Sequence, residues 1–273
     1  MFKEILKNVR EKSPLIHNIT NYVTVNDCAN ILLACGASPI MSDDPQEVEE
    51  ITSICDGLNI NIGTLNSHTI PSMFSAGKKA NQLGHPVLLD PVGAGASSLR
   101  TDTAKALLEN VKFAVIRGNI SEIKALCQNT ASTKGVDANS DDAVKKDNLE
   151  EAVCFAKAFA KQTGSVIAIT GETDIVTDGS RAYCIFNGNP MMSKITGTGC
   201  QLSAMTTAYV AANPQNTLEA VAAAVCAMGV CGEAGLLQMS QTDGNISYRG
   251  YIIDAIYNLT GDILEEKSRF IIK

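Results

Sequence analysis

Two spacings of hydrophobic positions alternate along most of the chain. Short apolar runs, typical of buried strands, are separated by longer stretches with apolar residues three or four positions apart, which is the spacing of amphipathic helices. The runs that predict strands are Ala37–Met41, Leu58–Ile62, Pro86–Leu89, Phe113–Ile116 and Val166–Thr170. The segments that predict helices are 1–12, 24–35, 44–55, 67–83, 101–110, a helix opening at Ser121, and 149–162. This alternation predicts an α/β fold, with a mainly parallel central sheet and helices on both faces.

The pattern changes after residue 170. Residues 174–189 predict a β-hairpin with its turn at Asp178-Gly179. We expect a further strand over Met191–Thr196, and helices from about Cys200, Thr217 and Tyr248. Residues 129–148 are polar and without periodicity, which indicates a loop. No internal repeat or linker divides the chain, so we predict a single domain over residues 1–273.

Composition and charge argue against several classes of protein. The 273 residues, 45% of them hydrophobic, are enough to bury a substantial core. A net charge of -7 without a Lys/Arg cluster argues against nucleic acid as the main partner. The amphipathic N-terminus does not resemble a signal peptide, and the apolar run Ala220–Gly232 is shorter than the ~20 residues of a bilayer span. Nine cysteines without a CxxC pair are typical of reduced thiols, so we expect a soluble, cytoplasmic protein without a membrane segment.

A glycine-rich turn precedes one of the predicted helices. Gly197, Thr198 and Gly199 stand directly before Cys200. The first N–H groups of a helix have no partner within the helix, and the helix dipole adds positive charge there. Such a place binds anions, phosphate above all. The same pattern also suits a turn that only connects two elements.

Polar clusters follow the ends of the predicted strands. Ligands bind at the carboxyl ends of strands in open α/β sheets, so these clusters are expected to meet. Asp90 and Glu122 supply oxygens of the kind that Mg²⁺ binds beside a nucleotide, although each also suits a turn cap or a first helical turn. Arg117 suits either a phosphate or a structural carboxylate. The clusters are 90–95, 117–122, 170–172 and the turn at 197–199.

Six segments in combination resemble one enzyme family. They are HNITNYV (17–23), GASPIM (36–41), NIGTL (61–65), LLDPVGAG (88–95), IRGNISEI (116–123) and TGTGC (196–200). Together they resemble the hydroxyethylthiazole kinases, a thiamine-salvage family with the ribokinase-like fold. The resemblance extends from about Pro14 to the C-terminal helices and is weak over Thr130–Asn148.

The resemblance implies an activity and a set of site residues. It implies that ATP and Mg²⁺ are needed to transfer the γ-phosphate to the primary alcohol of 4-methyl-5-(2-hydroxyethyl)thiazole. It also implies a homotrimer with substrate sites at the subunit interfaces. The implied contacts are Met41, Gly197 and Asn21 for the thiazole; Arg117 and Thr170, with the nearby Asn119, for the nucleotide; and Asp90 and Glu122 for the metal.

Cys200 stands where most of the superfamily has an aspartate base. A thiol has a pKa of ~8.5, which a helix N-terminus lowers, so we expect some thiolate here. Phosphoryl transfer depends more on positioning and charge neutralisation than on a strong base. We therefore predict a positioning and weak-base role for Cys200, with the N–H groups of Gly197, Thr198 and Gly199 meeting the charge on the transferred phosphoryl group. The alternative is a buried apolar cysteine like the other eight.

Two other functions remain open. One is a kinase for a different small alcohol, such as a pyrimidine or a sugar, against which Cys200 and the NITN motif argue. The other is a non-catalytic nucleotide-binding regulator, against which the presence of Asp90, Glu122 and Arg117 argues. His17 is a lone histidine among apolar residues, so we expect a structural role and leave it outside the catalytic set.

Overall fold

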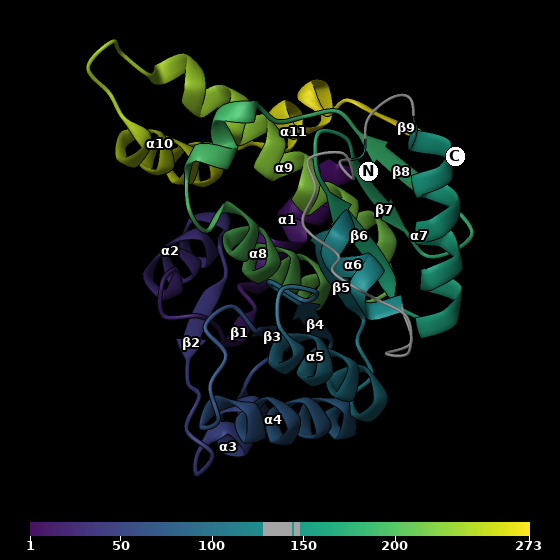
Figure 1. Cartoon of the computed structure of the whole chain (residues 1–273). Helices are drawn as coiled ribbons and strands as arrows, with labels where there is room; N and C mark the ends of the chain where they lie inside the picture. Colours follow the sequence, from purple (N-terminus) through teal and green to yellow (C-terminus); the bar gives the residue numbers. More distant parts are fainter. Residues whose placement is uncertain (128–143, 145–147) are drawn as a thin grey trace.

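A single central sheet organises the chain. The structure is a computed structural model that describes residues 1–127, 144 and 148–273, so the expected loop at 129–148 lies almost wholly outside the described residues. Within them, the strands form one sheet in the order β2-β1-β3-β4-β5-β6-β7-β8-β9 (Figure 1). The strands are β1 (Leu15–Ile19), β2 (Ser38–Met41), β3 (Gly57–Asn61), β4 (Val87–Asp90), β5 (Val115–Asn119), β6 (Val166–Thr170), β7 (Asp174–Thr177), β8 (Ala182–Ile185) and β9 (Phe270–Ile272).

Most of this sheet is parallel. The strands from β2 to β6 pair in parallel, and β7, β8 and β9 add an antiparallel end. The predicted hairpin is confirmed as β7 and β8, and Asp178 Oδ1 stabilises its turn by accepting the N–H groups of Ser180 and Arg181 at 2.8 and 3.0 Å. The five predicted strands are all present in the parallel part.

Helices cover both faces of the sheet, and each face has its own apolar core (Figure 1). One layer contains α1 (Phe2–Lys12), α2 (Val25–Cys35), α8 (Thr198–Ala212), α9 (Thr217–Gln238), α10 (Asn245–Asn258) and α11 (Gly261–Lys267). The other contains α3 (Val48–Ile54), α4 (Thr69–Leu83), α5 (Ser98–Asn110), α6 (Ile120–Cys127) and α7 (Leu149–Thr163). The predicted fold class, a mainly parallel sheet between two helical layers, is confirmed.

Two helices in the first layer are buried on nearly all sides. α9 is apolar around most of its circumference, as expected of a helix inside a core. α8 also buries polar residues, among them Gln201, Ser203 and Thr207. Among the described residues, α9 is also the helix that is long and apolar enough to cross a bilayer. However, 78% of its most apolar stretch is buried inside the protein, which is what a core helix requires.

The strand β1 is not evident from the sequence because polar residues interrupt its apolar pattern. His17 is fully buried, with Nδ1 3.0 Å from Thr52 Oγ1 and Nε2 2.9 Å from the Ser42 carbonyl oxygen. Burial lowers the pKa of His17, which favours the neutral ring. The expected structural role of His17 is therefore confirmed, with one side-chain partner and one backbone partner.

The strand predicted over Met191–Thr196 is wrong. Residues Pro190–Lys194 form a 3₁₀-helix instead. Asn189 caps it by accepting the N–H of Met191 at 2.9 Å, and Pro190 has the fixed φ that suits a first helical turn. The glycine-rich turn therefore follows a short helix rather than a strand, although α8 begins at Thr198 close to the expected place.

Candidate active site

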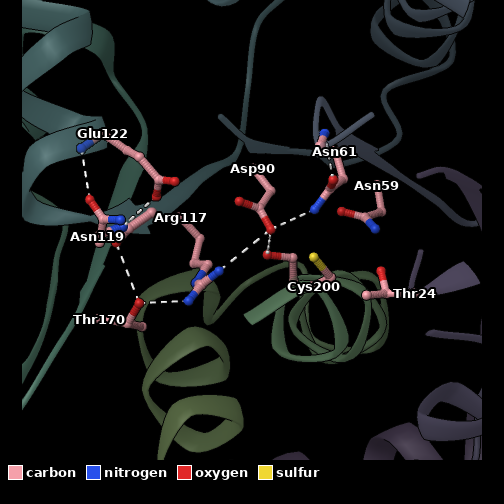
Figure 2. Close-up of polar contacts among 12 residues, drawn as sticks. Thr24, Asn59, Asn61, Asp90, Arg117, Asn119, Glu122, Thr170 and Cys200 are labelled. Atoms are coloured by element: carbon pink, nitrogen blue, oxygen red, sulfur yellow. Dashed lines mark hydrogen bonds and ion pairs between the residues drawn. The ribbon is translucent and has the colours of Figure 1, made fainter. Parts of the chain in front are cut away.

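Side chains from four neighbouring strands meet the start of α8 at the carboxyl edge of the sheet (Figure 2). Asn61 ends β3, Asp90 ends β4, Thr170 ends β6, and Arg117 lies near the end of β5. Ser203, in the second turn of α8, donates to Asp90 Oδ2 at 2.8 Å, which joins the helix to the strand ends. Parallel strands bring their carboxyl ends to one edge, and this is why residues far apart in the sequence meet here.

Asp90 lies at the centre of this group. Its carboxyl is fully buried, and Oδ2 accepts from Asn61 Nδ2 at 2.8 Å, Ser203 Oγ at 2.8 Å and Arg117 Nη1 at 3.5 Å. Burial raises the pKa of Asp90, and the Arg117 guanidinium and these hydrogen bonds offset that rise only in part. Among the described residues, no group hydrogen-bonds Asp90 Oδ1, so one buried oxygen is left for a ligand.

Arg117 connects Asp90 to the next strand and to α8. Its Nη2 donates to Thr170 Oγ1 at 2.6 Å, and its Nη1 lies 3.5 Å from Asp90 Oδ2 (Figure 2). The guanidinium also lies against Gly199, because a Cβ at that position would be only 2.5 Å from Nη1. A positive charge therefore lies over the first turn of α8, where an incoming phosphate would also meet free N–H groups.

The glycine-rich turn has a backbone that only glycine adopts easily. Gly197 is the N-cap of α8, with φ at 89°, and a Cβ there would lie 2.4 Å from Thr24 Cγ2. The first intrahelical hydrogen bond runs from the Gln201 N–H to the Gly197 carbonyl at 2.9 Å. The N–H groups of Thr198, Gly199 and Cys200 therefore precede the helical ladder and have no acceptor within the helix.

Cys200 carries a neutral thiol, so the thiolate expected from its place at a helix N-terminus is wrong. Burial raises the pKa of Cys200, and the negative charge of Asp90 raises it further. Hydrogen bonds from Thr24, Asn21 and Asn61 lower it by less. Removal of the thiol from water beside a carboxylate thus favours its neutral form.

Asn21 and Asn61 link Cys200 to Asp90. Asn21 Nδ2 donates to Cys200 Sγ at 3.2 Å and to Asn61 Oδ1 at 3.0 Å, and Asn61 Nδ2 then donates to Asp90 Oδ2. Asn21 Oδ1 accepts both the N–H and the hydroxyl of Thr24, at 3.1 and 3.0 Å. Both polar atoms of the Asn21 side chain thus have partners within the protein, so Asn21 positions the thiol, and the predicted thiazole contact at Asn21 stays a prediction.

Sequence reasoning did not select Asn61, Thr24 or Ser203 as site residues. Asn61 stands at the end of a predicted strand, like the residues that were selected, and that signal was available. Thr24 and Ser203 have no comparable signal, because their roles depend on the approach of α2 and α8 to the strand ends.

Glu122 and Asn119 form a reciprocal cap at the start of α6 (Figure 2). The Asn119 N–H donates to Glu122 Oε2, and the Glu122 N–H donates to Asn119 Oδ1, both at 2.8 Å. Glu122 Oε1 also accepts the N–H of Gly93, in the loop after Asp90, at 2.8 Å. Glu122 therefore has the structural role that was considered as an alternative, and it lies beside the Asp90 loop at the same time.

The two carboxyls fit a metal ion that brings ligands from a substrate. Within the described part of the chain, no group of three or more His, Cys, Asp or Glu residues forms a metal site. Burial raises the pKa of Glu122, and the charge of Asp90 raises it further, so a cation would stabilise both carboxylates. Mg²⁺ usually takes one or two carboxylates together with phosphate oxygens and waters, and Asp90 Oδ1 is unpartnered.

A cavity of about 710 Å³ opens beside Arg117, which is large enough for a nucleotide. Arg117, Thr170, Thr198 and Gly199 form one wall. The rest of the lining is Gly171, Glu172, Asp174, Asn187, Gly188, Asn189, Pro190, Met192, Ser193, Leu202, Val225, Met228 and Gly229. The predicted nucleotide residues Arg117 and Thr170 thus lie in the cavity wall, whereas the Asn119 oxygen is engaged in capping α6.

Met41 lies apart from this group. It ends β2, the edge strand of the sheet, and pairs with Asn18 of β1. Two strands, β1 and β3, separate β2 from the strand that carries Asp90. Met41 lies at the carboxyl end of its strand, as Asp90 does, but on the outermost strand of the sheet. The predicted thiazole contact at Met41 thus stays a prediction.

Asp174 lines the cavity and gives a prediction on stability. It is half-buried, and burial raises its pKa to about 7, against the effects of the Gly171 N–H and Arg117. The folded protein thus holds this proton more tightly than the unfolded chain, so stability falls as pH rises from about 4 through 7.

Asp174→Asn cannot ionise and keeps an oxygen for the Gly171 N–H. We expect its melting temperature to exceed that of the natural protein by a few degrees at pH 8 and by less at pH 5; a difference independent of pH would contradict this.

The fold and the site together define a small-molecule kinase with the ribokinase-like fold. The chain matches the model of the hydroxyethylthiazole kinase family over residues 6–262 and belongs to that family. It is 66% identical over 270 residues to the hydroxyethylthiazole kinase of Clostridium acetobutylicum, with 99% of each chain covered. It is 51% identical to that of Clostridium beijerinckii, with 97% of this chain and 95% of that one covered.

Solved structures agree with this assignment. The hydroxyethylthiazole kinase protein from Pyrococcus horikoshii superposes with a TM-score of 0.87 at 34% identity, covering 100% of this chain and 98% of that one. A pyridoxal kinase from Staphylococcus aureus in complex with ADP superposes with a TM-score of 0.62 at 16% identity, covering 95% and 97%. The second likeness concerns the fold alone.

Proposed function

We propose that this protein transfers the γ-phosphate of ATP to the primary hydroxyl of 4-methyl-5-(2-hydroxyethyl)thiazole, a step of thiamine salvage. Membership of the hydroxyethylthiazole kinase family supports this acceptor. One observation carries the proposal beyond the family: the Cys200 thiol lies at the phosphate-binding start of α8, linked to the buried Asp90 through Asn21 and Asn61. We assign the whole chain to one kinase domain, acting in the cytoplasm.

The nucleotide occupies the cavity beside Arg117. Its γ-phosphate lies against the Arg117 guanidinium and the N–H groups of Thr198 and Gly199, which are fixed before the reaction begins. Donors held in this way stabilise the charge that builds up on the phosphoryl oxygens. Thr170 holds the guanidinium in place through the hydrogen bond at 2.6 Å.

The hydroxyl oxygen attacks the γ-phosphorus while the bond to the β-phosphate oxygen breaks, and ADP leaves. Cys200 Sγ accepts a hydrogen bond from the hydroxyl and so holds its oxygen in line. Because the transition state is loose, the hydroxyl proton leaves late. It passes to a phosphoryl oxygen and is lost to solvent from the product, so a neutral thiol suffices.

Mg²⁺ belongs to the same proposal. Asp90, through its unpartnered oxygen, and Glu122 would hold the ion together with phosphate oxygens and waters. When bound, the ion neutralises charge on the phosphates. Asp90 itself also keeps Arg117 in place through the 3.5 Å contact.

The thiazole binds next to Gly197 and extends toward Met41, and we propose that a homotrimer completes its site at the subunit interfaces. The support is that Tyr22 and Val23, directly after Asn21, have exposed fractions of 76% and 57%. Apolar side chains so exposed beside a site are common at protein interfaces. Sedimentation of the purified protein measures the assembly directly, and a monomer would contradict the shared site.

The activity is tested with purified protein, ATP, Mg²⁺ and a panel of alcohols. The panel contains the thiazole alcohol, a pyrimidine alcohol, pyridoxal and a sugar. We expect the kcat/KM for the thiazole alcohol to exceed the others by at least about 100-fold, which corresponds to ~2.7 kcal/mol of differential transition-state binding. Equal rates across the panel would contradict the proposed acceptor, and nucleotide binding without transfer would indicate a regulator.

Cys200→Asp is expected to have a kcat of the same order of magnitude as the natural protein, or higher. A carboxylate can accept the same hydrogen bond, and it can also take the proton that a neutral thiol leaves on the substrate. Cys200→Ala removes the hydrogen bond that holds the hydroxyl oxygen in line, and it is expected to lower kcat by about 10²-fold, the effect of a misplacement of about 1 Å at a reacting centre. The measurement is steady-state kcat for both variants. Complete inactivity of Cys200→Asp would refute the assigned role.

A further inference from the structure

The cavity has a second wall that carries no charge. Residues 186–189 connect β8 to the 3₁₀-helix, and Asn187, Gly188 and Asn189 all line the cavity. Val225, Met228 and Gly229 of α9 continue this wall. Backbone amides combined with apolar side chains suit a flat group such as a nucleobase. The triphosphate, by contrast, requires Arg117 and the start of α8.

An ion pair outside the cavity holds this connecting segment. Glu233 Oε1 accepts the Gly188 N–H at 2.7 Å, and Arg269 bonds both Glu233 oxygens, Oε2 through Nη1 at 3.0 Å and Oε1 through Nη2 at 2.8 Å. Arg269 Nη2 also donates to the Phe186 carbonyl at 2.9 Å. The Arg269 N–H donates to Asn187 Oδ1 at 2.7 Å. The Glu233 and Arg269 side chains thus bond Gly188 and Phe186, and Glu233 Oε1 also accepts from Asn187 Nδ2 at 3.4 Å, so the pair holds three consecutive residues of the connecting segment.

The segment is also fixed from the side of α9. A Cβ at Gly229 would lie 2.6 Å from Asn187 Cβ and 2.8 Å from its carbonyl carbon, so the helix and the segment lie in direct backbone contact. Gly188 has φ at 119°, a region that favours glycine, and Asn187 is 5% exposed. The path of the wall therefore depends on a few specific contacts rather than on a regular strand or helix.

We propose that Glu233 and Arg269 are positioning residues for nucleotide binding: they hold residues 186–189 as the wall against which the base of the nucleotide binds. The inference rests on the proposed kinase activity and adds residues that touch neither substrate. Loss of the pair lets the wall move, which weakens binding of the base. The reacting groups at Arg117 and Cys200 stay in place, so the chemical step is unaffected.

The chain offers a matched control for this pair. Arg181 and Glu219 form an ion pair of 2.7 Å, with side-chain exposed fractions of 52% and 13%, compared with 55% and 27% for Arg269 and Glu233. Neither Arg181 nor Glu219 lines the cavity or bonds residues 186–189. In both pairs the arginine is more than half exposed, so a guanidinium that loses its partner stays hydrated and the variants are expected to remain folded.

The experiment compares Glu233→Gln, Arg269→Lys and their double variant with Glu219→Gln in the full chain. The readouts are KM for ATP, kcat, KM for the thiazole alcohol, and the Kd of ADP by calorimetry. We expect Glu233→Gln to raise KM for ATP and the Kd of ADP by about tenfold, as loss of hydrogen bonds to a charged group does. We expect kcat and the alcohol KM to stay within twofold of the natural protein, and Glu219→Gln to change none of the four.

The double variant adds a second criterion. Because the two residues act as one unit, its KM for ATP is expected to match that of Glu233→Gln rather than the product of the single effects. Arg269→Lys keeps the positive charge but loses the planar guanidinium that bonds both Glu233 oxygens. It is therefore expected to raise KM for ATP and to leave the melting temperature unchanged. An unchanged Kd for ADP, a fall in kcat alone, or equal effects in Glu219→Gln would each overturn the inference. A natural protein that binds ADP but phosphorylates no alcohol would refute the proposed function, while the Kd of ADP would still test the pair.

Discussion

Replacing Asp90 with Asn is expected to lower kcat by about 10³-fold, the effect of removing one preorganised group that stabilises transition-state charge. The asparagine oxygen would face the donors Asn61, Ser203 and Arg117, which now bond Asp90 Oδ2. Its NH₂ group would then occupy the place of Oδ1, where a cation is proposed to bind. Arg117 would also lose its charged partner. Steady-state kcat at saturating ATP, Mg²⁺ and thiazole alcohol measures the effect.

The fold of this variant is expected to remain intact. Burial raises the pKa of Asp90, so a neutral side chain avoids a desolvation cost, whereas the loss of the charged partner of Arg117 acts in the opposite direction. We therefore expect a folded variant with a cooperative thermal transition. Asp56→Asn is the control, because Asp56 is an exposed carboxylate whose Oδ2 accepts the Leu15 N–H at 2.7 Å, at the opposite edge of the sheet. It should keep natural kcat. Near-natural kcat for Asp90→Asn would show that Asp90 is only a structural cap.

Gly199→Ala is expected to separate activity from stability. The new Cβ would lie 2.5 and 2.8 Å from the Arg117 guanidinium nitrogens, so Arg117 must move away from Asp90 and Thr170. A displacement of about 1 Å at a reacting centre lowers the rate by about 10²-fold, and we expect a loss of that size in kcat. Alanine is a better helix former than glycine, so the melting temperature should stay equal or increase.

Gly250→Ala is the matched control for this change. Gly250 lies within α10, and a Cβ there would meet no atom within 4 Å. The same gain in helix propensity is therefore expected, with unchanged kcat. If Gly199→Ala kept natural kcat, the guanidinium would not need its present place over the first turn of α8, and the proposed phosphate contact would be wrong.

Most elements of the fold could be predicted because their signal is local. A strand buried on both faces, such as Leu58–Ile62, is a continuous apolar run, and Gly36 and Gly84 end helices as expected, with φ at 98° and 74°. The strand β1 was missed for a physical reason. His17 and Asn18 interrupt the apolar pattern of β1 but are buried, because Thr52, Ser42 and Ile16 supply their hydrogen bonds. Those partners cannot be recognised before the fold is known.

Two further elements, β9 and α11, are also absent from the sequence prediction. β9 has three exposed residues and pairs with β8 at the edge of the sheet. A strand that short has no periodicity, and its existence depends on the neighbour that it pairs with. The composition of Met191–Thr196 predicts a strand, although residues Pro190–Lys194 form a 3₁₀-helix.

By itself, the sequence determined the family, the α/β architecture and the chemical groups of the site: a thiol after a glycine-rich turn, carboxylates and an arginine at strand ends. These follow from residue types and short spacings. The tertiary structure alone decided what each group does. It made Cys200 a neutral thiol, used both polar atoms of Asn21 internally, and placed Arg117 over Gly199. The reason is that desolvation and hydrogen-bond partners depend on residues that are distant in the chain, as Asp90 and Ser203 are more than 100 residues apart. Periodicity and capping, by contrast, depend only on adjacent turns.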